Sequence, residues 1–588
     1  MDLSMLDLGY TAGTPFQEYL MNSVKVKKAL NEFLFYEVRF VSDALHPSQI
    51  YLQYPMANPY WYRDFKNAME PLSSMEYSAE WNRLFNRLHG QIQTEMAIFK
   101  TKLNASANPR DVVSLMLKYK LRDYQAYDAA QFKVKYESNN RRALILSEPR
   151  TGKTRVALAV TAETAGMGTV ALVICPKSAQ AGWVRECKVF DESSTKLFEV
   201  SVVQKISDLK SLKLWDDVIN VRVISYELFK KLQLPNQVRM LTSKCKRVTL
   251  LGDEIHRLRN FKTQQSKAIF DFKEFCEKDG VDLGIIGMTG TPAVKDSSDI
   301  FGTLSLINDS KIHFRPYYDA YDLFKEYFYY CEDTSFGRQA KALRREDELN
   351  YIVQMCSVQT KQKELDIFQG YDKVYRKVEL NMDDEQRRIY DSVYETMEYD
   401  DEIDCQNKLV QLTRLQQICI DPSSIVDSYK GVSPKLRWVA KFALSKQMKF
   451  IVAAKKNAPL THLKEILERV GIESRFIKGS LSLADRMKAL EDFSSFGVDV
   501  LLMQLDTGRE ALTIPEAQAT VFLDRDFAQG FNEQAEARMT PIDGTPCVKY
   551  VIDLVMRDTK EEGIYQTLVI RKKSIDAVNT VFKPRKES

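Results

Sequence analysis

Short apolar runs separated by amphipathic stretches recur in two blocks of this 588-residue chain. In the first block they are ALIL (143–146), TVALVIC (169–175), VRVIS (221–225), VTLLG (248–252) and LGIIGM (283–288). In the second block, from residue 449 onward, they are KFIVAA, SRFIKG, VDVLLM, ATVFLD and KYVIDLV. Short apolar runs between helical patterns are typical of parallel strands covered by helices. The sequence therefore predicts an α/β fold with two tandem lobes, each a parallel sheet flanked by helices.

The rest of the chain divides around these two blocks. The pattern TKEE at 559–562 is a capping box, which predicts the start of a final helix. The predicted segments are a mainly helical N-terminal accessory domain (1–110), a first lobe (111–310), a helical protrusion or linker (311–432), a second lobe (433–558) and a C-terminal helix (559–588).

Composition limits the classes of function. The net charge is only +4, so binding to a nucleic acid requires local basic patches rather than an overall basic chain. The nine cysteines form no Cys-x-x-Cys pair, which predicts a reducing compartment without a zinc site or a disulfide framework. No apolar run approaches the roughly 20 residues of a membrane span, and the N-terminus lacks the features of a signal peptide. We therefore expect a protein that is neither secreted nor membrane-bound.

Aromatic residues gather in the proline-broken stretch YPMANPYWYRDF, at 54–65. Exposed aromatic rings can stack on nucleic-acid bases, whereas buried rings simply fill a core. The sequence leaves both interpretations open.

The stretch SEPRTGKT, at 147–154, ends in the Gly-Lys-Thr of a phosphate-binding loop. The strict pattern has a glycine where Ser147 stands, but an apolar run precedes the loop and a helical pattern follows it. A strand, a tight loop and a helix N-terminus together form a phosphate cradle. Lys153 would reach the β- and γ-phosphates of a nucleotide, and the Thr154 hydroxyl would bind Mg²⁺. Arg150, Thr151 and Gly152 complete the predicted loop, for which the alternative is an ordinary surface turn.

An acidic pair follows a second apolar run, in VTLLGDEIH. Asp253 would hold Mg²⁺, and Glu254 would orient and activate the attacking water. Two acids at the start of a helix are the structural alternative. Loop and acidic pair together predict a site for ATP and Mg²⁺.

Several further segments, in a fixed order, carry a resemblance to superfamily-two helicases, and within them to the SWI/SNF-like DNA translocases, from about residue 121 to 575. The segments are LRDYQAYDAA (121–130), ALVICPKSAQAGWVRE (171–186), VRVISYELF (221–229), DEIHRLRN (253–260), GMTGTPAVKDSSDIFGTLSLIN (287–308), QLTRLQQICIDP (411–422) and GSLSLADRMKALEDF (479–493). The resemblance implies two RecA-like lobes with ATP between them, and a C-terminal brace helix from Thr559.

The resemblance also implies roles for individual residues. Gln125 would read adenine, and Lys153, Asp253, Glu254 and Arg538 would be catalytic. The residues that would couple nucleotide state to movement are His256, Thr289, Gly290, Thr291 and Gln534. Those that would contact DNA are Lys177, Ser225, Tyr226, Lys478, Ser480 and Thr507. For each DNA-contacting residue the alternative is an ordinary loop position, and for His256 it is a buried core histidine.

The second-lobe signature departs from the family pattern Gln-x-x-Asp-Arg-x-x-Arg-x-Gly-Gln. Here it reads QAEARMTPIDG, with Gln534 and Arg538 retained and Ala537 in place of the aspartate. Pro541 replaces the second arginine and can neither carry charge nor donate a hydrogen bond. Our hypothesis is that Arg509, in LDTGREAL, partly replaces the lost charge near the γ-phosphate.

The resemblance implies an ATP-dependent DNA translocase or helicase that acts on duplex, forked or branched DNA in replication-fork or recombination-intermediate remodelling. The alternatives are an RNA-directed or RNA-polymerase-associated ATPase, and a non-enzymatic DNA-binding scaffold with a degenerate ATPase. Short insertions resemble bacterial, phage or fork-remodelling members more than chromatin remodellers. We expect a monomer in the cytoplasm or nucleoid, in the host cytoplasm if the chain is phage-encoded, with replication or recombination proteins as partners.

Overall fold

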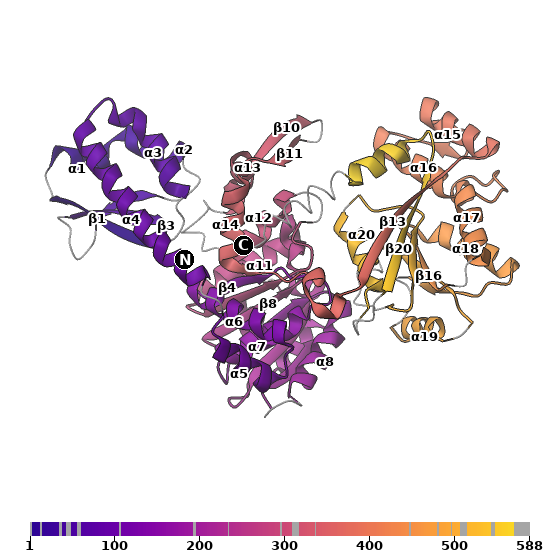
Figure 1. Cartoon of the computed structure of the whole chain (residues 1–588), viewed down its shortest axis with the longest axis horizontal. Coiled ribbons are helices and arrows are strands. Elements are labelled where there is room, and N and C mark those ends of the chain that lie inside the picture. The colour runs from indigo at the N-terminus through magenta and orange to yellow at the C-terminus, as the bar shows by residue number, and fades with distance from the viewer. Residues whose placement is uncertain are drawn as a thin grey trace. The chain divides into compact units, whose positions relative to one another are not determined.

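The computed structural model describes most of the chain, and the described part divides after Thr360 into two compact units (Figure 1). The described residues are 3–569 except 12–13, 34–37, 43–48, 56–59, 105–106, 192–195, 233–234, 261, 294–296, 308–316, 335–336, 446–447, 479–480, 482, 496, 506–513, 528 and 542–546. Each unit contains one large parallel sheet, which confirms the predicted fold class.

Seven parallel strands form the sheet of the first unit, in the order β12-β4-β9-β8-β5-β7-β6. Their bounds are β4 Arg142–Ile145, β5 Val170–Cys175, β6 Phe198–Val203, β7 Ile219–Ser225, β8 Arg247–Asp253, β9 Asp282–Met288 and β12 Ser357–Val358. The five predicted strands of this lobe are confirmed. The other two were not predicted, because polar residues interrupt β6 and only its ends are buried, and β12 is only two residues long.

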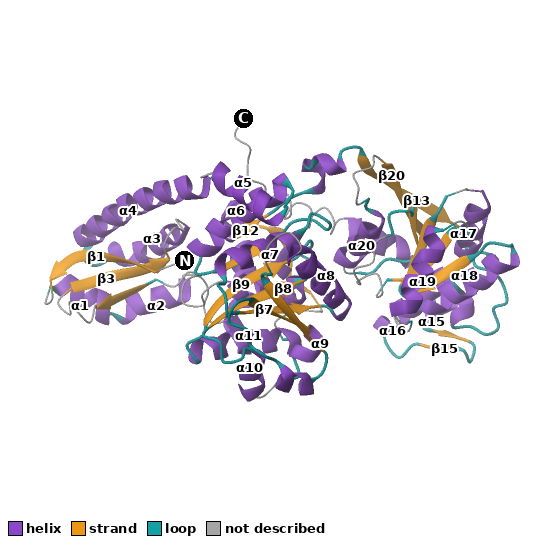
Figure 2. Ribbon diagram, turned by 90° about the horizontal axis from the view of Figure 1, so that it is seen from below, coloured by secondary structure: helices purple, strands orange, loops and turns teal. Residues whose placement is uncertain are grey.

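Helices cover both faces of this sheet, because successive strand residues point to opposite sides. Figure 2 shows α6 and α7 on one face of the sheet and α11 on the other. Side chains such as Ala143 and Ile145 belong to the core against α5–α8, and Leu144 and Ile285 to the core toward α11 and α12. The helix bounds are α5 Pro109–Tyr119, α6 Asp123–Ser138, α7 Lys153–Thr164, α8 Gln180–Asp191, α9 Tyr226–Phe229, α10 Pro235–Leu241, α11 Gln264–Lys278 and α12 Ile300–Ile307.

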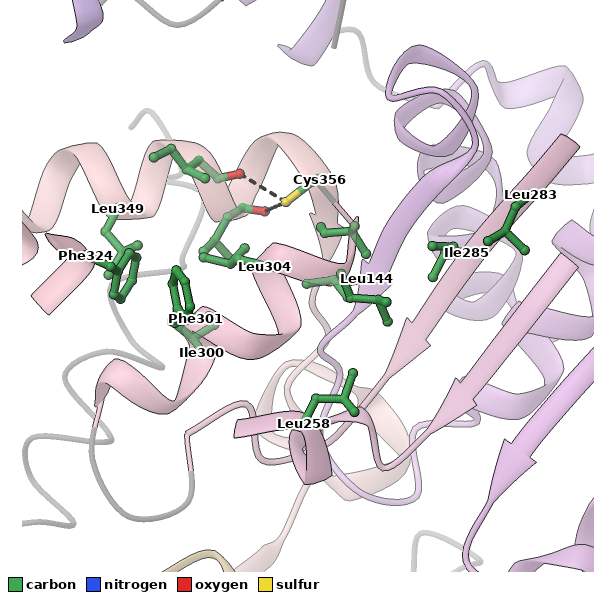
Figure 3. Close-up of a cluster of buried hydrophobic side chains, with 14 of the residues drawn as sticks. Leu144, Leu258, Leu283, Ile285, Ile300, Phe301, Leu304, Phe324, Leu349 and Cys356 are labelled. Carbon is green, nitrogen blue, oxygen red and sulfur yellow. Dashed lines mark hydrogen bonds between the residues drawn. The ribbon is translucent and has the colours of Figure 1, made fainter. Parts of the chain in front are cut away.

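A helical extension continues the second of these cores. It consists of α13 (Tyr317–Phe328), the hairpin β10 (Tyr329–Thr334) and β11 (Gly337–Leu343), and α14 (Glu346–Cys356). Figure 3 shows Phe324 and Leu349 of the extension beside Phe301 and Leu304 of α12, all fully buried. The Cys356 thiol lies 3.1 Å from the Ile352 carbonyl at the end of α14. The extension is therefore part of the first unit's core.

The N-terminal domain was predicted to be mainly helical, and the structure adds a sheet. The helices are α1 Pro15–Asn22, α2 Val24–Phe33, α3 Tyr60–Ser73 and α4 Ser78–Asn104, and the antiparallel strands, in the order β1-β3-β2, are β1 Leu3–Thr11, β2 Arg39–Ser42 and β3 Gln49–Pro55. Trp61 and Phe65 of the aromatic stretch are buried on α3, so at these positions the core interpretation holds rather than base stacking. Among the described helices, α4 included, none is long and apolar enough to cross a membrane.

Polar contacts join α3 to the helical extension. The Tyr327 hydroxyl lies within hydrogen-bonding distance of Asp64 and, at 2.9 Å, of Glu348, so the two buried carboxylates share its one hydrogen. Arg63 and Arg345 supply the compensating charges, at 3.1 Å from Glu348 and Asp64 respectively. Because buried carboxylates need such partners, this network holds the N-terminal domain to the extension.

The second unit contains a parallel sheet of six strands, in the order β13-β20-β19-β16-β18-β17. The strands are β13 Tyr371–Leu380, β16 Phe450–Ala454, β17 Ser474–Ile477, β18 Val500–Gln504, β19 Ala519–Phe522 and β20 Cys547–Met556, of which only β13 was not predicted. The helices are α15 Asp384–Thr396, α16 Lys408–Ile420, α17 Pro434–Ser445, α18 Asn457–Arg469, α19 Leu483–Ser494 and α20 Gln529–Glu536, and a small hairpin pairs β14 Glu398–Tyr399 with β15 Ile403–Asp404.

The segment predicted as one helical linker, 311–432, is in fact divided between the two units. Its first part, to Thr360, belongs to the first unit and ends in β12. Its second part contributes β13, which pairs along its whole length with β20. β13 was missed because none of its residues is fully buried, so it lacks an apolar run. Thr559 caps a helix described for residues 560–569, with Glu561 N–H 3.2 Å from its hydroxyl, and the rest of the predicted C-terminal helix lies outside the described residues.

We expect the stability of the second unit to depend on pH through His462. This side chain of α18 lies 2.8 Å from the buried Asp421 carboxylate, a hydrogen bond that raises the pKa of His462 above its ordinary 6.5. A raised pKa in the folded state stabilises the fold fully below the unfolded-state pKa and loses this contribution as pH rises through the folded-state value. The difference in free energy of unfolding between wild type and the His462→Gln variant should therefore be largest below about pH 6.5 and should decrease at higher pH.

Urea unfolding of the full chain at several pH values measures this difference. His89→Gln, at an exposed position on α4, serves as the control. A difference between wild type and His462→Gln that stays constant across the range would contradict the prediction.

Candidate nucleotide site

The phosphate loop connects the end of β4 to the start of α7, which begins at Lys153. Arg150 and Gly152 both have positive φ, of +66° and +86°. A Cβ on Gly152 would lie 2.1 Å from Nε2 of Gln125, so any side chain there would collide with this amide. The loop thus requires glycine at 152 for a close approach as well as for its backbone conformation.

Gln125 of α6 supports the loop from behind. Its Nε2 donates to the Thr151 carbonyl at 3.3 Å, and its Oε1 accepts from the Arg122 N–H at 3.1 Å. Both polar ends of this buried side chain are used, so its orientation is determined by the protein. The structure brings Gln125 to the loop, as predicted, whereas adenine reading stays a prediction.

Lys153 and the acidic pair lie close enough to influence one another. Burial lowers the pKa of Lys153, and the charges of Glu254 and Asp253 act in the opposite direction. Burial, and after it the charge of Glu254, raises the pKa of Asp253 to about 6. Lys153 Nζ lies 3.2 Å from the Glu148 carbonyl, within the curve of the loop. An ammonium, a helix N-terminus and two carboxylates at one place are the groups that a magnesium nucleotide needs.

Asp253 is held by two aromatic residues whose role the sequence did not reveal. The Trp183 indole Nε1 donates to Asp253 Oδ2 at 3.0 Å, and the Tyr226 hydroxyl donates to the Asp253 carbonyl oxygen at 2.7 Å. Trp183 follows β5 and Tyr226 follows β7, and both are buried. The sequence pointed to Trp183 only through the family resemblance of the segment ALVICPKSAQAGWVRE. The fold was needed to show that its indole N–H donates to Asp253.

The predicted coupling residues of the first unit form one cluster. His256 is buried, with Nδ1 2.9 Å from the Thr289 hydroxyl and 3.2 Å from a Glu254 carboxylate oxygen. Thr291 N–H donates to the same Thr289 hydroxyl at 3.0 Å. Close polar contacts therefore connect Glu254 and His256, and hydrogen bonds continue from His256 to the loop after β9.

Gly290 of this loop also packs on the phosphate loop. A Cβ at Gly290 would lie 2.9 Å from the ring of Pro149. Pro149, unusual in a loop that is ordinarily glycine-rich, thus fills the space against the coupling segment. Ser147 accepts a hydrogen bond from the Thr360 N–H at 3.1 Å.

The residues predicted to contact DNA differ in their exposure to solvent. Lys177 is exposed at the start of a short helix, and Lys478 is half-buried after β17. The Ser225 hydroxyl accepts from Leu228 N–H as the N-cap of α9. Tyr226 is only 1% exposed and its side chain packs inside the unit, so its contact with DNA stays a prediction. Ser480, Thr507 and Arg509 lie outside the described residues.

In the second unit, α20 carries Gln534, and Arg538 lies in the short helix that follows it, Ala537–Met539. Pro541 is buried just beyond. Arg525, packed over the Phe522 ring, lies 2.7 Å from Glu536 of α20 and 2.5 Å from Asp553 of β20. The Tyr375 hydroxyl of β13 donates to Glu536 at 2.9 Å. This buried network holds α20 to the sheet.

We expect Trp183→Phe to weaken magnesium-dependent nucleotide binding. The variant keeps an aromatic ring but loses the N–H that orients the Asp253 carboxylate, and a hydrogen bond to a charged group contributes about 1.5–3 kcal/mol. The Mg²⁺ concentration for half-maximal ATP binding should rise about tenfold. Trp81→Phe, at an equally buried tryptophan of the N-terminal domain, is the control. Equal magnesium dependence in the two variants would contradict the role of Trp183.

We expect Arg525→Leu to destabilise the second unit by about 3–5 kcal/mol, because it leaves the buried carboxylates of Glu536 and Asp553 without compensation. Chemical denaturation of the full chain measures the change. Arg437→Leu removes an exposed pair with Asp383 and should cost about 1 kcal/mol or less. Similar losses in the two variants would show that the network does not stabilise the fold.

Comparison with known proteins places this site in a family. The family model of the SNF2-related domain matches residues 124–424, and that of the helicase conserved C-terminal domain matches residues 434–540. The chain is 26% identical over 486 residues to the zebrafish (Danio rerio) protein named chromodomain-helicase-DNA-binding protein 1-like, covering 78% of this chain and 44% of that protein. It is 22% identical over 413 residues to the mouse (Mus musculus) protein of the same name, covering 67% and 43%.

Among solved structures, the Sulfolobus solfataricus SWI2/SNF2 ATPase core in complex with dsDNA matches at 19% identity and a TM-score of 0.33, over 80% of this chain and 96% of that chain. The chain spans less than half the length of the two curated relatives. The SNF2-related match covers just over half of the chain and contains the phosphate loop, the acidic pair and the coupling residues of the first unit. The chain therefore belongs to the SNF2-related family.

Proposed function

We propose that this chain is an ATPase that uses Mg²⁺ and ATP to translocate along DNA. The observation that carries the proposal is the assembled site of the first unit. There the charge of Glu254 acts on the pKa values of both Lys153 and Asp253, while Trp183 and Tyr226 hold Asp253 in place. Such preorganisation of charged groups is what phosphoryl transfer requires of a protein.

Each residue of the site has a definite task in this proposal. The loop N–H groups and Lys153 bind the β- and γ-phosphates, and Thr154 with Asp253 would hold Mg²⁺, which neutralises charge on the phosphates. Glu254 accepts the proton of the attacking water, next to His256. Gln125 reads adenine, and Arg150 and Thr151 complete the loop. Arg538 of the second unit supplies charge to the γ-phosphate, with Gln534 and the cluster of His256, Thr289, Gly290 and Thr291 as couplers.

DNA is the proposed substrate because both curated relatives carry DNA binding in their names and the family is SNF2-related. Lys177 and Lys478, with Ser225, Ser480 and Thr507, are the proposed contacts to the phosphate backbone, which is where such proteins gain affinity. Arg509 as a partial substitute for the charge lost at Pro541 also stays a proposal. Action on forks or recombination intermediates, a bacterial or phage origin, and a monomeric state are the finer parts of the hypothesis.

The proposal predicts that DNA stimulates ATP hydrolysis by the full chain. Hydrolysis is measured with Mg²⁺ against single-stranded, duplex, forked and four-way DNA and against RNA. Lys153→Ala, Glu254→Gln and Arg538→Ala should lower kcat by at least about 100-fold, because each removes a group that acts on the transferring phosphoryl group.

The control is Lys196→Ala, which removes an exposed lysine of the first unit paired with Glu199. Stimulation by RNA but not by DNA would favour an RNA-directed ATPase. Binding of ATP without turnover under any condition would favour the scaffold alternative, and an equal response to every DNA form and to no DNA would overturn the proposed translocase.

A further inference from the structure

The phosphate loop is bonded to the last residues of the first unit. β12 pairs in parallel with β4, with Ser357 beside Leu144 and Val358 beside Ile145. The hydrogen bonds continue past the end of the strands, from Leu146 N–H to the Val358 carbonyl at 2.9 Å. The backbone pairing between β12 and β4 therefore extends into the phosphate loop.

The next residues extend these contacts into the sequence SEPRTGKT. The Glu148 N–H donates to the Thr360 carbonyl at 2.9 Å, and the Thr360 N–H donates to the Ser147 hydroxyl at 3.1 Å. Ser147 and Thr360 are only 2% and 6% exposed, so water does not readily replace these bonds. A glycine at 147, as in the strict pattern, would leave the buried Thr360 N–H without this acceptor.

Helix α6 supports both sides of this contact. The Thr360 hydroxyl donates to the Asp128 carboxylate, while Gln125, one turn earlier, donates to Thr151 at the other end of the loop. Lys135, on the same face of α6, donates to the carbonyls of Gln354 and Ser357 at 2.8 and 2.7 Å. One helix face thus holds the phosphate loop and the strand beside it in a common frame.

The contact between Ser147 and Thr360 lies at the end of the first unit. Thr360 is the last residue of the first unit, and the second unit begins at the next residue. On its other side, β12 follows directly from α14, whose Leu349 and Cys356 are buried in the core (Figure 3). From Thr360 the chain continues through two short helices, Gln362–Glu364 and Asp366–Phe368, into β13 at Tyr371.

We propose that Ser147, Thr360 and Asp128 form a clasp that positions the phosphate loop and couples its geometry to the chain segment entering the second unit. The proposal rests on the proposed function only in taking the loop to bind a nucleotide. Phosphate binding orders Glu148 and its neighbours, and the clasp passes this order to residues 357–360. Ser147, a departure from the strict loop pattern, is the residue that makes the connection.

Variants of the full chain test the clasp. Ser147→Ala removes the acceptor of the Thr360 N–H, and Thr360→Val removes the hydroxyl that reaches Asp128 while keeping the side-chain volume. Thr360→Ser keeps the hydroxyl and is the conservative rescue. Thr242→Val removes a similarly buried hydroxyl just after α10, bonded to Val238 and outside the clasp, and is the matched control.

Three quantities are measured: the affinity for a fluorescent ATP analogue with Mg²⁺, hydrogen exchange of residues 146–149 and 357–360, and the free energy of unfolding. In wild type, nucleotide should slow exchange at 357–360. Ser147→Ala and Thr360→Val should weaken nucleotide affinity about tenfold, equivalent to about 1.4 kcal/mol, and abolish the slowing at 357–360. Thr360→Ser should behave as wild type, and Thr242→Val should lose stability without losing affinity.

The clasp is overturned if Ser147→Ala only loses stability, as Thr242→Val does, and keeps wild-type affinity. It is also overturned if wild type binds nucleotide without any change in exchange at 357–360. A wild-type chain that binds no nucleotide overturns the proposed function instead. In that case hydrogen exchange without nucleotide tests the clasp. If the clasp exists, Ser147→Ala should speed exchange at both 146–149 and 357–360.

Discussion

The parallel alignment of the strands in the first unit is the constraint on which the site depends. Strands β4, β9, β8, β5 and β7 are neighbours and run in one direction, so the loops at their carboxyl ends meet at one edge of the sheet. Those loops carry the phosphate loop, the coupling segment, the acidic pair, Trp183 and Tyr226. Residues more than 100 positions apart in the chain are thereby brought into hydrogen-bonding distance, as between Ser147 and Thr360.

Neighbouring side chains determine how the charged groups of this edge are used. A carboxylate that loses part of its hydration is destabilised unless hydrogen bonds hold it. The Trp183 indole N–H, beside the partly buried Asp253, supplies such a bond without adding a charge. Gln125 and Pro149 act on the loop in a similar way, one by hydrogen bonding to Thr151 and one by packing on Gly290. The loop's departures from a glycine-rich pattern are therefore matched by contacts elsewhere in the unit.

In the second unit, buried ion pairs hold the helix of the signature segment to the sheet. Its signature segment lacks an aspartate at Ala537 and an arginine at Pro541, yet α20 is tied to the sheet through Glu536, Arg525 and Asp553. Removing water from three charged groups is tolerable only when they compensate one another at short distance. This network explains how α20 keeps its place while the signature itself has diverged.

The sequence alone determined the two parallel sheets, because buried strands require apolar runs and ten of these runs are visible. It also determined the phosphate loop and the acidic pair, because their chemistry requires particular residue types at close spacing. It could not reveal β6, whose apolar residues are interrupted by polar ones, β12, which is very short, or β13, which has no fully buried residue. Nor could it reveal the sheet of the N-terminal domain. Only the tertiary structure decided that Tyr226 is buried, that Trp183 serves Asp253, and that Ser147 has its partner at Thr360. Hydrogen-bond partners distant in sequence are chosen by the packing of the sheet, and no local pattern records that choice.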